Sequence, residues 1–489
     1  MITMPDNHPH EKNSVTDLEK DAASTSDLSV VIPGDKHGWL SHPIARSLLS
    51  WGVEERGTVP VPEEERVDTQ YYKIFFVWFS MNFNILSFST GTLGPIAFGL
   101  GLRDSCLTIL FFNILACALP AYFNTWGPQT GMRQMIQSRY SFGYFGIIIP
   151  AILNLIGLCG FNILNGILGG QALASVSSNM SWDVGIVIIF VIALLVSFMG
   201  YRVLNWYERV SWFPVLIAFL VALGVSGKNL YNAQPAEPAT AATILSFASV
   251  IAGFVITYSA MASDFTMYYS PNVRRSRIFW YAYLGYIVPI VLLECLGAAA
   301  VLAAPNVPSW TEGYGTDGNV GGLLEAMLQP GCLSVTANIA CTLYSICFNF
   351  QVMVPAMSKV PRYVFSIVGT VIALPLSIVG AHKFYTTLTN FLSLIGYWAS
   401  AYGAILLVTF STYNHAIWNV PGRLPWGAAA ITAVIMSFAL IIPCMNQIWY
   451  QGPIGITSGD IGFEIAFPLA GLLYLPLRKL ELKYQNTQY

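Results

Sequence analysis

The chain has 489 residues, of which 55% are hydrophobic and only 10% are charged, and its mean hydropathy is +0.58. Soluble domains carry about 25% charged residues, so this composition excludes a soluble protein and predicts an all-α polytopic membrane protein. The net charge of −2 is uninformative, because the distribution of charge among the loops matters more than its sum. The six histidines form no HExxH pattern and the eight cysteines form no CxxC pair, so no metal site is expected.

The N-terminal stretch, residues 1–70, is polar and contains charged runs such as DLEKDAAST and VPEEERVD. It lacks an apolar core of the length that a signal peptide requires. It also has too few large apolar residues to bury. We therefore expect a disordered cytosolic tail.

Crossing a membrane takes roughly 18–25 apolar residues, and twelve segments of about this length follow. They lie at about 74–100, 106–123, 144–172, 184–200, 210–227, 244–266, 279–303, 323–349, 363–381, 387–410, 427–446 and 461–476.

The basic residues of the loops between these segments indicate the orientation. If the N-terminus is cytoplasmic, ten basic residues fall in inner loops and three in outer loops, as the positive-inside rule requires. Both termini are then predicted to be cytoplasmic. The inner set is Arg133, Arg139, Arg202, Arg209, Arg274, Arg275, Arg277, Lys359, Arg362 and Arg423, and the outer set is Arg103, Lys228 and Lys383.

The first segment contains a polar stretch, residues 80–101, with the sequence SMNFNILSFSTGTLGPIAFGLG. Gly91, Gly94 and Pro95 favour a backbone break here, because proline removes a hydrogen-bond donor and glycine offers little resistance to unwinding. A Gly/Pro-interrupted membrane segment is the best sequence indicator of a transporter's binding site. The alternative is a proline kink that serves only packing.

The sixth segment resembles the first, because GFVITYSAMASDF also joins an apolar run to small and hydroxyl residues. Five helices separate the two, which is the spacing that two inverted five-helix repeats require. Asp264 ends this segment near Arg274 and Arg275, so we expect a gate or an end-capping salt bridge there.

Polar and aromatic side chains share helix faces in two further segments. Phe161 and Asn165 are four residues apart in the third, and Asn338 and Thr342 are four apart in the eighth. Carboxamides, hydroxyls and rings with few charges suit a flat, uncharged ligand that stacks on the rings and hydrogen-bonds along its edge. The alternative is that each polar group only joins neighbouring helices.

Glu294 lies in the middle of the seventh segment, within PIVLLECLGAA. An ionisable group at this depth is costly and is by default a candidate functional residue. We consider it a candidate carrier of a coupled proton. The alternative is a permanently neutral or paired residue of the bundle.

Several motifs then carry a family resemblance: GVEERGTVPVPEEER, WFSMNFNILSFSTGTLGP, TWGPQTGMRQMIQSRYSFG, NILNGILGGQ, GYRVLNWYERVSW, SDFTMYYSP and KVPRYVFSIVGT. The chain resembles the nucleobase–cation symport-1 family, specifically its fungal purine–cytosine permease branch. The resemblance implies twelve transmembrane helices, arranged as a leucine-transporter-type 5+5 inverted repeat plus two C-terminal helices. It also implies that a proton is the coupling ion and that no cofactor is needed.

The resemblance places the substrate between the first, third, sixth and eighth helices. It implies that Ser87, Phe161 and Asn165 are contact residues. Tyr258, six residues before the aspartate of SDF, takes the place of a stacking aromatic that is usually tryptophan.

The eighth helix departs from the family pattern NNIPN. Asn338 keeps the first amide, whereas Ile339 and Thr342 replace the other two and Cys341 replaces the proline. Losing a hydrogen-bond partner can change selectivity by orders of magnitude, so the identity of the substrate stays open.

These inferences divide the chain into a tail (1–70), a first repeat (71–227), a second repeat (228–410), two further helices (411–477) and a cytosolic tail (478–489). The predicted function is import of a purine base or cytosine across the plasma membrane, by proton symport through alternating access. Alternatives are a permease for a pyridoxine-like vitamin or a ureide and, more remotely, a nucleobase sensor. An enzyme is not expected, because no nucleophile–base pair or metal cluster lies at a common depth. No nucleic-acid partner is expected either.

Overall fold

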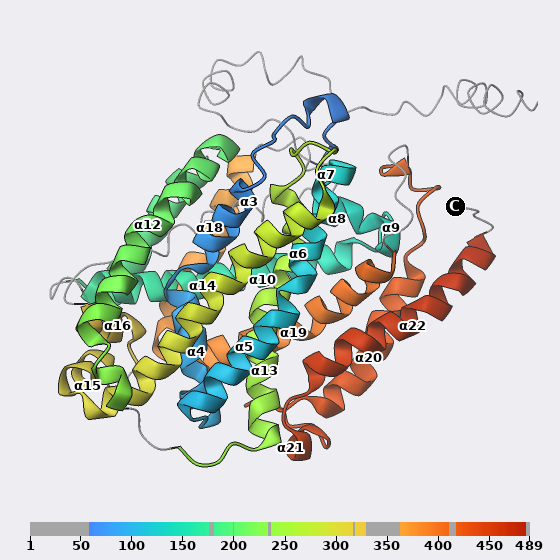
Figure 1. Ribbon diagram of the computed structural model, residues 1–489. Coiled ribbons are helices and arrows are strands. Elements are labelled where there is room, and N and C mark those ends of the chain that lie inside the picture. Colours follow the sequence, from blue (N-terminus) through green and yellow to red (C-terminus); the bar gives the residue numbers. More distant parts are fainter. Residues whose placement is uncertain are drawn as a thin grey trace, which may run out of the picture. The chain divides into compact units, whose positions relative to one another are not determined.

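The computed structural model describes residues 58–175, 180–198, 200–232, 236–315, 318–328, 362–409 and 417–485. All of them belong to one unit, residues 52–489. Helices and short 3₁₀ turns build this unit (Figure 1). Five helical stretches of the described part are long and apolar enough to cross a membrane: Leu102–Thr130, Ile148–Ser175, Ala241–Ala260, Arg275–Asn306 and Phe384–Thr409.

The first half of the unit follows the expected segments closely. Two helices share the first segment, and three short helices fill the connection between the second and third. The elements are η1 (Glu63–Glu65), α3 (Lys73–Asn82), α4 (Ile85–Phe98), α5 (Leu102–Ala116), α6 (Ala118–Asn124), α7 (Trp126–Thr130), α8 (Gln134–Gln137), α9 (Arg139–Phe142), α10 (Ile148–Ser175), α11 (Trp182–Phe198) and α12 (Gly200–Ser226).

The second half begins with another interrupted segment and ends with a paired set of long helices. Its elements are η2 (Asn229–Asn232), α13 (Ala241–Ile256), η3 (Thr257–Ala260), η4 (Ala262–Phe265), α14 (Arg275–Ala303), η5 (Ala304–Asn306), α15 (Pro308–Tyr314), α16 (Val320–Leu328), α18 (Arg362–Gly380), η7 (Ala381–Lys383), α19 (Phe384–Thr409), α20 (Ala428–Cys444), α21 (Gly455–Ser458) and α22 (Gly462–Gln485). The predicted eighth segment begins within α16, and its remainder lies outside the described residues.

The first segment is broken, but not where Gly91, Gly94 and Pro95 predicted. The chain leaves helical geometry at Phe83 and Asn84, and α4 then runs without interruption through those three residues. Asn84 causes the break, because its side chain accepts hydrogen bonds from the backbone nitrogens of Leu86 and Ser87 and so caps a new helix. Pro95 is tolerated near the end of α4.

The sixth segment is broken as well. The α-helix α13 ends at Ile256 and continues as two 3₁₀ turns, η3 and η4, with Met261 between them at φ −138° and ψ 7°, outside helical geometry. The predicted likeness of the first and sixth segments is therefore present as a pair of discontinuous helices. Irregular backbone of this kind at membrane depth is found where it is buried in protein or lines a cavity.

The last residues of the predicted N-terminal tail are packed against the unit, so the tail does not extend to residue 70. Val61 and Arg66 are buried. The backbone nitrogen of Val61 donates to Gly131 O at 2.8 Å, and Arg66 Nη1 donates to Pro128 O at 2.7 Å. The prediction from polar composition was wrong here, because Arg66 is buried and hydrogen-bonds to the backbone carbonyl of Pro128.

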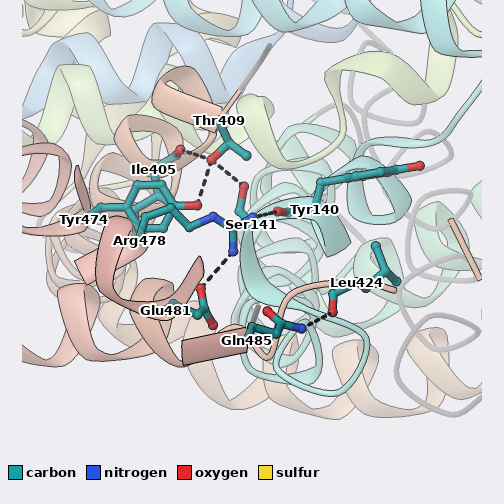
Figure 2. A network of polar contacts seen from close by, with 9 residues as sticks. All are labelled: Tyr140, Ser141, Ile405, Thr409, Leu424, Tyr474, Arg478, Glu481 and Gln485. Atoms are coloured by element: carbon teal, nitrogen blue, oxygen red, sulfur yellow. Dashed lines mark hydrogen bonds and ion pairs between the residues drawn. The ribbon is translucent and has the colours of Figure 1, made fainter. Parts of the chain in front are cut away.

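The C-terminal helix α22 extends beyond the predicted boundary at residue 477 and ends at Gln485. It packs against α19 and α20 (Figure 1). Figure 2 shows how its last turns are held: Arg478 Nη1 contacts Glu481 at 2.8 Å, Arg478 Nη2 donates to Tyr140 O at 3.2 Å, and Gln485 Nε2 donates to Leu424 O at 2.9 Å. Residues 478–485 of the stretch predicted as a tail are therefore part of the helical bundle.

Candidate substrate site

Four aromatic rings lie in contact beside the two helix breaks, a group that we call the ring column. Phe161 of α10 and Tyr258 of η3 are nearly parallel, with centroids 6.1 Å apart and an interplanar angle of 12°. Tyr286 of α14 and Trp78 of α3 both pack on Tyr258, with centroids 5.6 and 5.5 Å away, and they stack on each other at 4.5 Å. All four side chains are buried. The two predicted aromatic residues thus meet.

The column joins segments that lie far apart in the sequence. Helix α10 contacts both α4 and η3, and α19 contacts η3 as well. The indole nitrogen of Trp78 donates to Asn124 Oδ1 at 3.1 Å, and Asn124 Nδ2 reaches the Tyr286 hydroxyl at 3.3 Å. This buried amide joins Trp78 and Tyr286, because it bonds to the polar atoms of both aromatic side chains.

The site is closed in this conformation. A cavity of about 10 Å³ adjoins Phe161 and Tyr258, lined also by Asn154, Gly157, Leu158, Thr257, Met261 and Trp398. That space is enough for about one water molecule. A third ring between Phe161 and Tyr258 needs roughly 7 Å between their planes, because aromatic carbons approach to about 3.5 Å. The two rings must therefore separate to admit a heterocycle.

The polar side chains that were predicted to contact the substrate donate hydrogen bonds to backbone carbonyls of their own segments. Asn165 Nδ2 donates to Phe161 O at 2.8 Å, and Ser87 Oγ donates to Asn82 O at 2.6 Å, across the first break. Both side chains are fully buried. Asn338 and Thr342 lie outside the described residues, so the contribution of the eighth segment stays a prediction.

Glu294 lies apart from the ring column. Its side chain is fully buried on α14, and Oε2 accepts a hydrogen bond of 2.7 Å from Asn113 Nδ2 of α5. Gly91 of α4 packs directly on the backbone of Glu294, with no room for a Cβ. Gly91 is therefore a close-packing residue rather than part of a break. Glu294 and Tyr286 are eight residues apart, or about 12 Å along the helix.

Asp264 belongs to a dense polar region that we call the sealed end, formed by residues 130–143, η4 and the C-terminal half of α19. Every residue from 130 to 143 is buried. Asp264 Oδ1 accepts from the backbone nitrogen of Gln134 at 2.9 Å, and Ser138 Oγ lies 2.6 Å from the Tyr402 hydroxyl. Asp264 thus caps the connection before α8, a contact that its nearness to Arg274 and Arg275 in the sequence did not predict.

A larger cavity, which we call the vestibule, lies near the other ends of α4 and α13. It measures about 490 Å³. Its walls are the end of α4, the start of α13, the first turns of α19 and the connection between α20 and α22. They include Ile96, Ala97, Phe98, Ala242, Thr243, Ser246, Tyr385, Thr386, Thr389, Ser393, Asn446, Gln447, Ile448, Gln451, Gly459 and Asp460.

Sequence reasoning missed Trp78, Asn124 and Tyr286 in the ring column and Asn113 beside Glu294. One signal was available, since Asn113 and Asn124 are amides within or at the end of the apolar second segment. Buried amides need partners, so each pointed to a polar contact at that depth. The identity of those partners depends on how helices pack, which the sequence pattern did not supply.

Comparison with known proteins agrees with this architecture. The chain is similar to the structure of Mhp1, a nucleobase–cation-symport-1 family transporter in a closed conformation with bromovinylhydantoin bound, with a TM-score of 0.66 and 18% identity. The match covers 88% of this chain and 96% of that one. It confirms the predicted fold class, an all-α transporter fold of leucine-transporter type. The number of twelve helices stays a prediction.

Two curated relatives cover almost the whole chain. Purine-cytosine permease fcyB of Emericella nidulans is 35% identical over 96% of this chain and 98% of its own length. Vitamin B6 transporter TPN1 of Saccharomyces cerevisiae is 28% identical over 95% of this chain and 93% of its own. Residues 60–422 match the family described as permease for cytosine/purines, uracil, thiamine, allantoin. The chain therefore belongs to this permease family, as its motifs predicted.

Proposed function

We propose that this protein imports a purine base or cytosine across the plasma membrane by proton symport, through alternating access. The observation that carries the proposal is the near-parallel pair of Phe161 and Tyr258 beside two broken helices. A flat heterocycle presents two faces for stacking and an edge of donors and acceptors. The 35% identity to a purine-cytosine permease supports a nucleobase as the substrate.

In this proposal the base stacks between Phe161 and Tyr258 after the two rings separate. Asn165 and Ser87 exchange the bonds to their own segments for bonds to the edge of the base, together with Asn338. Such an exchange keeps buried polar groups satisfied in both states. The N- and C-termini are cytoplasmic in this proposal, which makes the sealed end the inner end and the vestibule the outer end.

Uptake of radiolabelled adenine in permease-null yeast tests the function. Cytosine, hypoxanthine, guanine, uracil and pyridoxine serve as competitors, at two external pH values and with an uncoupler. We expect adenine to enter, another base to compete and the uncoupler to stop uptake. If adenine does not enter although the protein reaches the cell surface in normal amount, this counts against the hypothesis that the substrate is a nucleobase.

Asn165→Ala tests the site. The change removes the amide predicted to bind the edge of the base, so uptake should fall at least tenfold without loss of surface protein. Asn306→Ala, at an exposed position, is the matched control and should leave uptake unchanged. Equal uptake in the Asn165 variant would disprove the site assignment.

Glu294 is the proposed proton carrier, because it is a buried acid whose Oε1 has no partner among the described residues. Glu294→Gln keeps the shape and the bond from Asn113 but cannot release a proton. We expect uptake in this variant to lose its dependence on external pH. Glu312→Gln, an exposed acid, is the control. An unaltered pH profile would exclude Glu294 as the carrier.

A vitamin B6-like substrate is the second candidate, supported by the 28% identity to a vitamin B6 transporter and by the altered eighth segment. The pyridoxine competition above separates the two substrates. A nucleobase sensor is the remote alternative. Transport that persists after deletion of residues 1–45, without a signalling defect, would exclude it.

A further inference from the structure

The vestibule differs from the ring-column site in size and openness. Its volume of about 490 Å³ falls in the range of roughly 300–1,000 Å³ that small-molecule pockets occupy. The vestibule shares no lining residue with the small cavity beside Phe161 and Tyr258. A guest of the vestibule is therefore separate from a base between Phe161 and Tyr258.

The charges of the vestibule favour a neutral guest. Its described lining contains neither lysine nor arginine, so nothing there pairs with an anion. Its one acid, Asp460, is buried and accepts from the Tyr397 hydroxyl, Gln447 Nε2 and the backbone nitrogens of Asn446 and Gly462. Three of these donors reach Oδ2 and one reaches Oδ1, so the carboxylate is already bound by neutral donors of its own chain.

The hydroxyl groups of the vestibule indicate a neutral, hydrogen-bonding guest. Thr386, Thr389 and Ser393 of α19 follow an i, i+3, i+7 spacing and so form a stripe on the side that lines the cavity. Thr389 is 9% exposed, and its Oγ1 has no hydrogen-bond partner among the described residues. Leaving a buried hydroxyl without a partner is unfavourable, so this group favours a guest that can form hydrogen bonds.

Planar groups complete the walls. Phe98 offers an aromatic ring beside the stripe, and Gln451 offers a carboxamide on an exposed side chain. Rings and carboxamides recognise the face and the edge of a heterocycle. The same kinds of group occur at the ring-column site, so one class of molecule fits both places.

We propose that the vestibule is a second binding site for a neutral planar heterocycle, occupied before the molecule reaches the ring column. This inference rests on the proposed function. The vestibule holds the heterocycle while the site between Phe161 and Tyr258 is closed, and the connection between α20 and α22 forms one wall.

The test counts bound bases on the purified full-length protein in lipid nanodiscs, using tritiated adenine in equilibrium dialysis. We expect two adenines per chain for the wild type and one for Asn165→Ala. The vestibule variant Thr389→Val with Gln451→Leu should also bind one, and its apparent KM for uptake should rise three- to tenfold. Thr387→Val, a neighbour on α19 outside the lining, is the matched control and should bind two.

The outcomes separate the two proposals. One adenine per wild-type chain that Asn165→Ala abolishes overturns the second site and leaves the proposed function standing. Two adenines in the Thr389→Val/Gln451→Leu variant also overturn it. No adenine on any variant, with an intact thermal melt, overturns the nucleobase function and the second site together.

Discussion

The sealed end and the vestibule end of the bundle are held together in different ways. At the sealed end, hydrogen bonds are spread over several segments: Gln134 to Asp264, Ser138 to Tyr402 and Ser141 to Thr409 at 2.9 Å. At the vestibule end, the single carboxylate of Asp460 collects four donors from three chain segments.

The difference matters because a transporter must open one end without unfolding the other. A typical hydrogen bond contributes about 0.5–1.5 kcal/mol, so scattered bonds break singly. Bonds to an ionised group are stronger and, on one acceptor, are lost together. The sealed end is therefore suited to opening, whereas Asp460 is suited to keeping the connection between α20 and α22 in place.

Of the three substitutions that test the difference between the two ends, Asp460→Asn should have the largest effect. The amide places an NH₂ against donors and removes the charge, so we expect a loss of about 3 kcal/mol and a melting temperature several degrees lower. Hydrogen–deuterium exchange should rise in residues 445–461 and not in 130–143. Asp183→Asn, at an exposed position, is the control. Equal exchange in the two segments would show that the ends are not independent.

Asp264→Ala should have an intermediate and opposite effect. It leaves the buried backbone nitrogen of Gln134 without this acceptor, which costs about 1–3 kcal/mol. Exchange should then rise in residues 130–143 while 445–461 stays protected, and adenine uptake should fall severalfold. Asp183→Ala is the matched control. Unchanged exchange at 130–143 would mean that Asp264 does not hold the sealed end.

Arg478→Gln should have the smallest effect. The arginine joins α22 to Tyr140 O and Glu481 at the edge of the sealed end, and its side chain is 14% exposed (Figure 2). We expect a loss of about 1 kcal/mol, with slightly faster exchange in α9 alone. Lys479→Gln, exposed on the same helix, should change nothing. A loss as large as that of Asp460→Asn would contradict the proposed ranking.

The sequence located the first break to the correct stretch but assigned it to the wrong residues. Gly91 and Pro95 are consistent with a break, yet an uninterrupted helix also accommodates them when a neighbour packs closely. Asn84 was the better indicator, since asparagine is among the strongest N-cap residues. The capping preference of Asn84 predicts the position of the break, whereas the prediction relied too much on Pro95.

The sequence pattern could not predict which side chains of distant helices contact one another. Helical spacing placed Phe161 and Asn165 on one face, but it could not show which neighbour that face meets. Asn113 and Glu294 are 181 residues apart, and only tertiary packing brings them to 2.7 Å. The position of Tyr258 opposite Phe161 was available from the family resemblance, not from periodicity.

Helix α14 has a mechanical consequence for the first break. It runs unbroken from Arg275 to Ala303 and touches both halves of the broken segment. A Cβ at Gly285 would lie 2.7 Å from Phe75 O on α3, and one at Gly91 of α4 would strike Glu294. Helix α14 therefore bridges the break between α3 and α4. Pro289 lies between these two contacts, so a hinge at Phe83–Asn84 turns only if α14 bends with it.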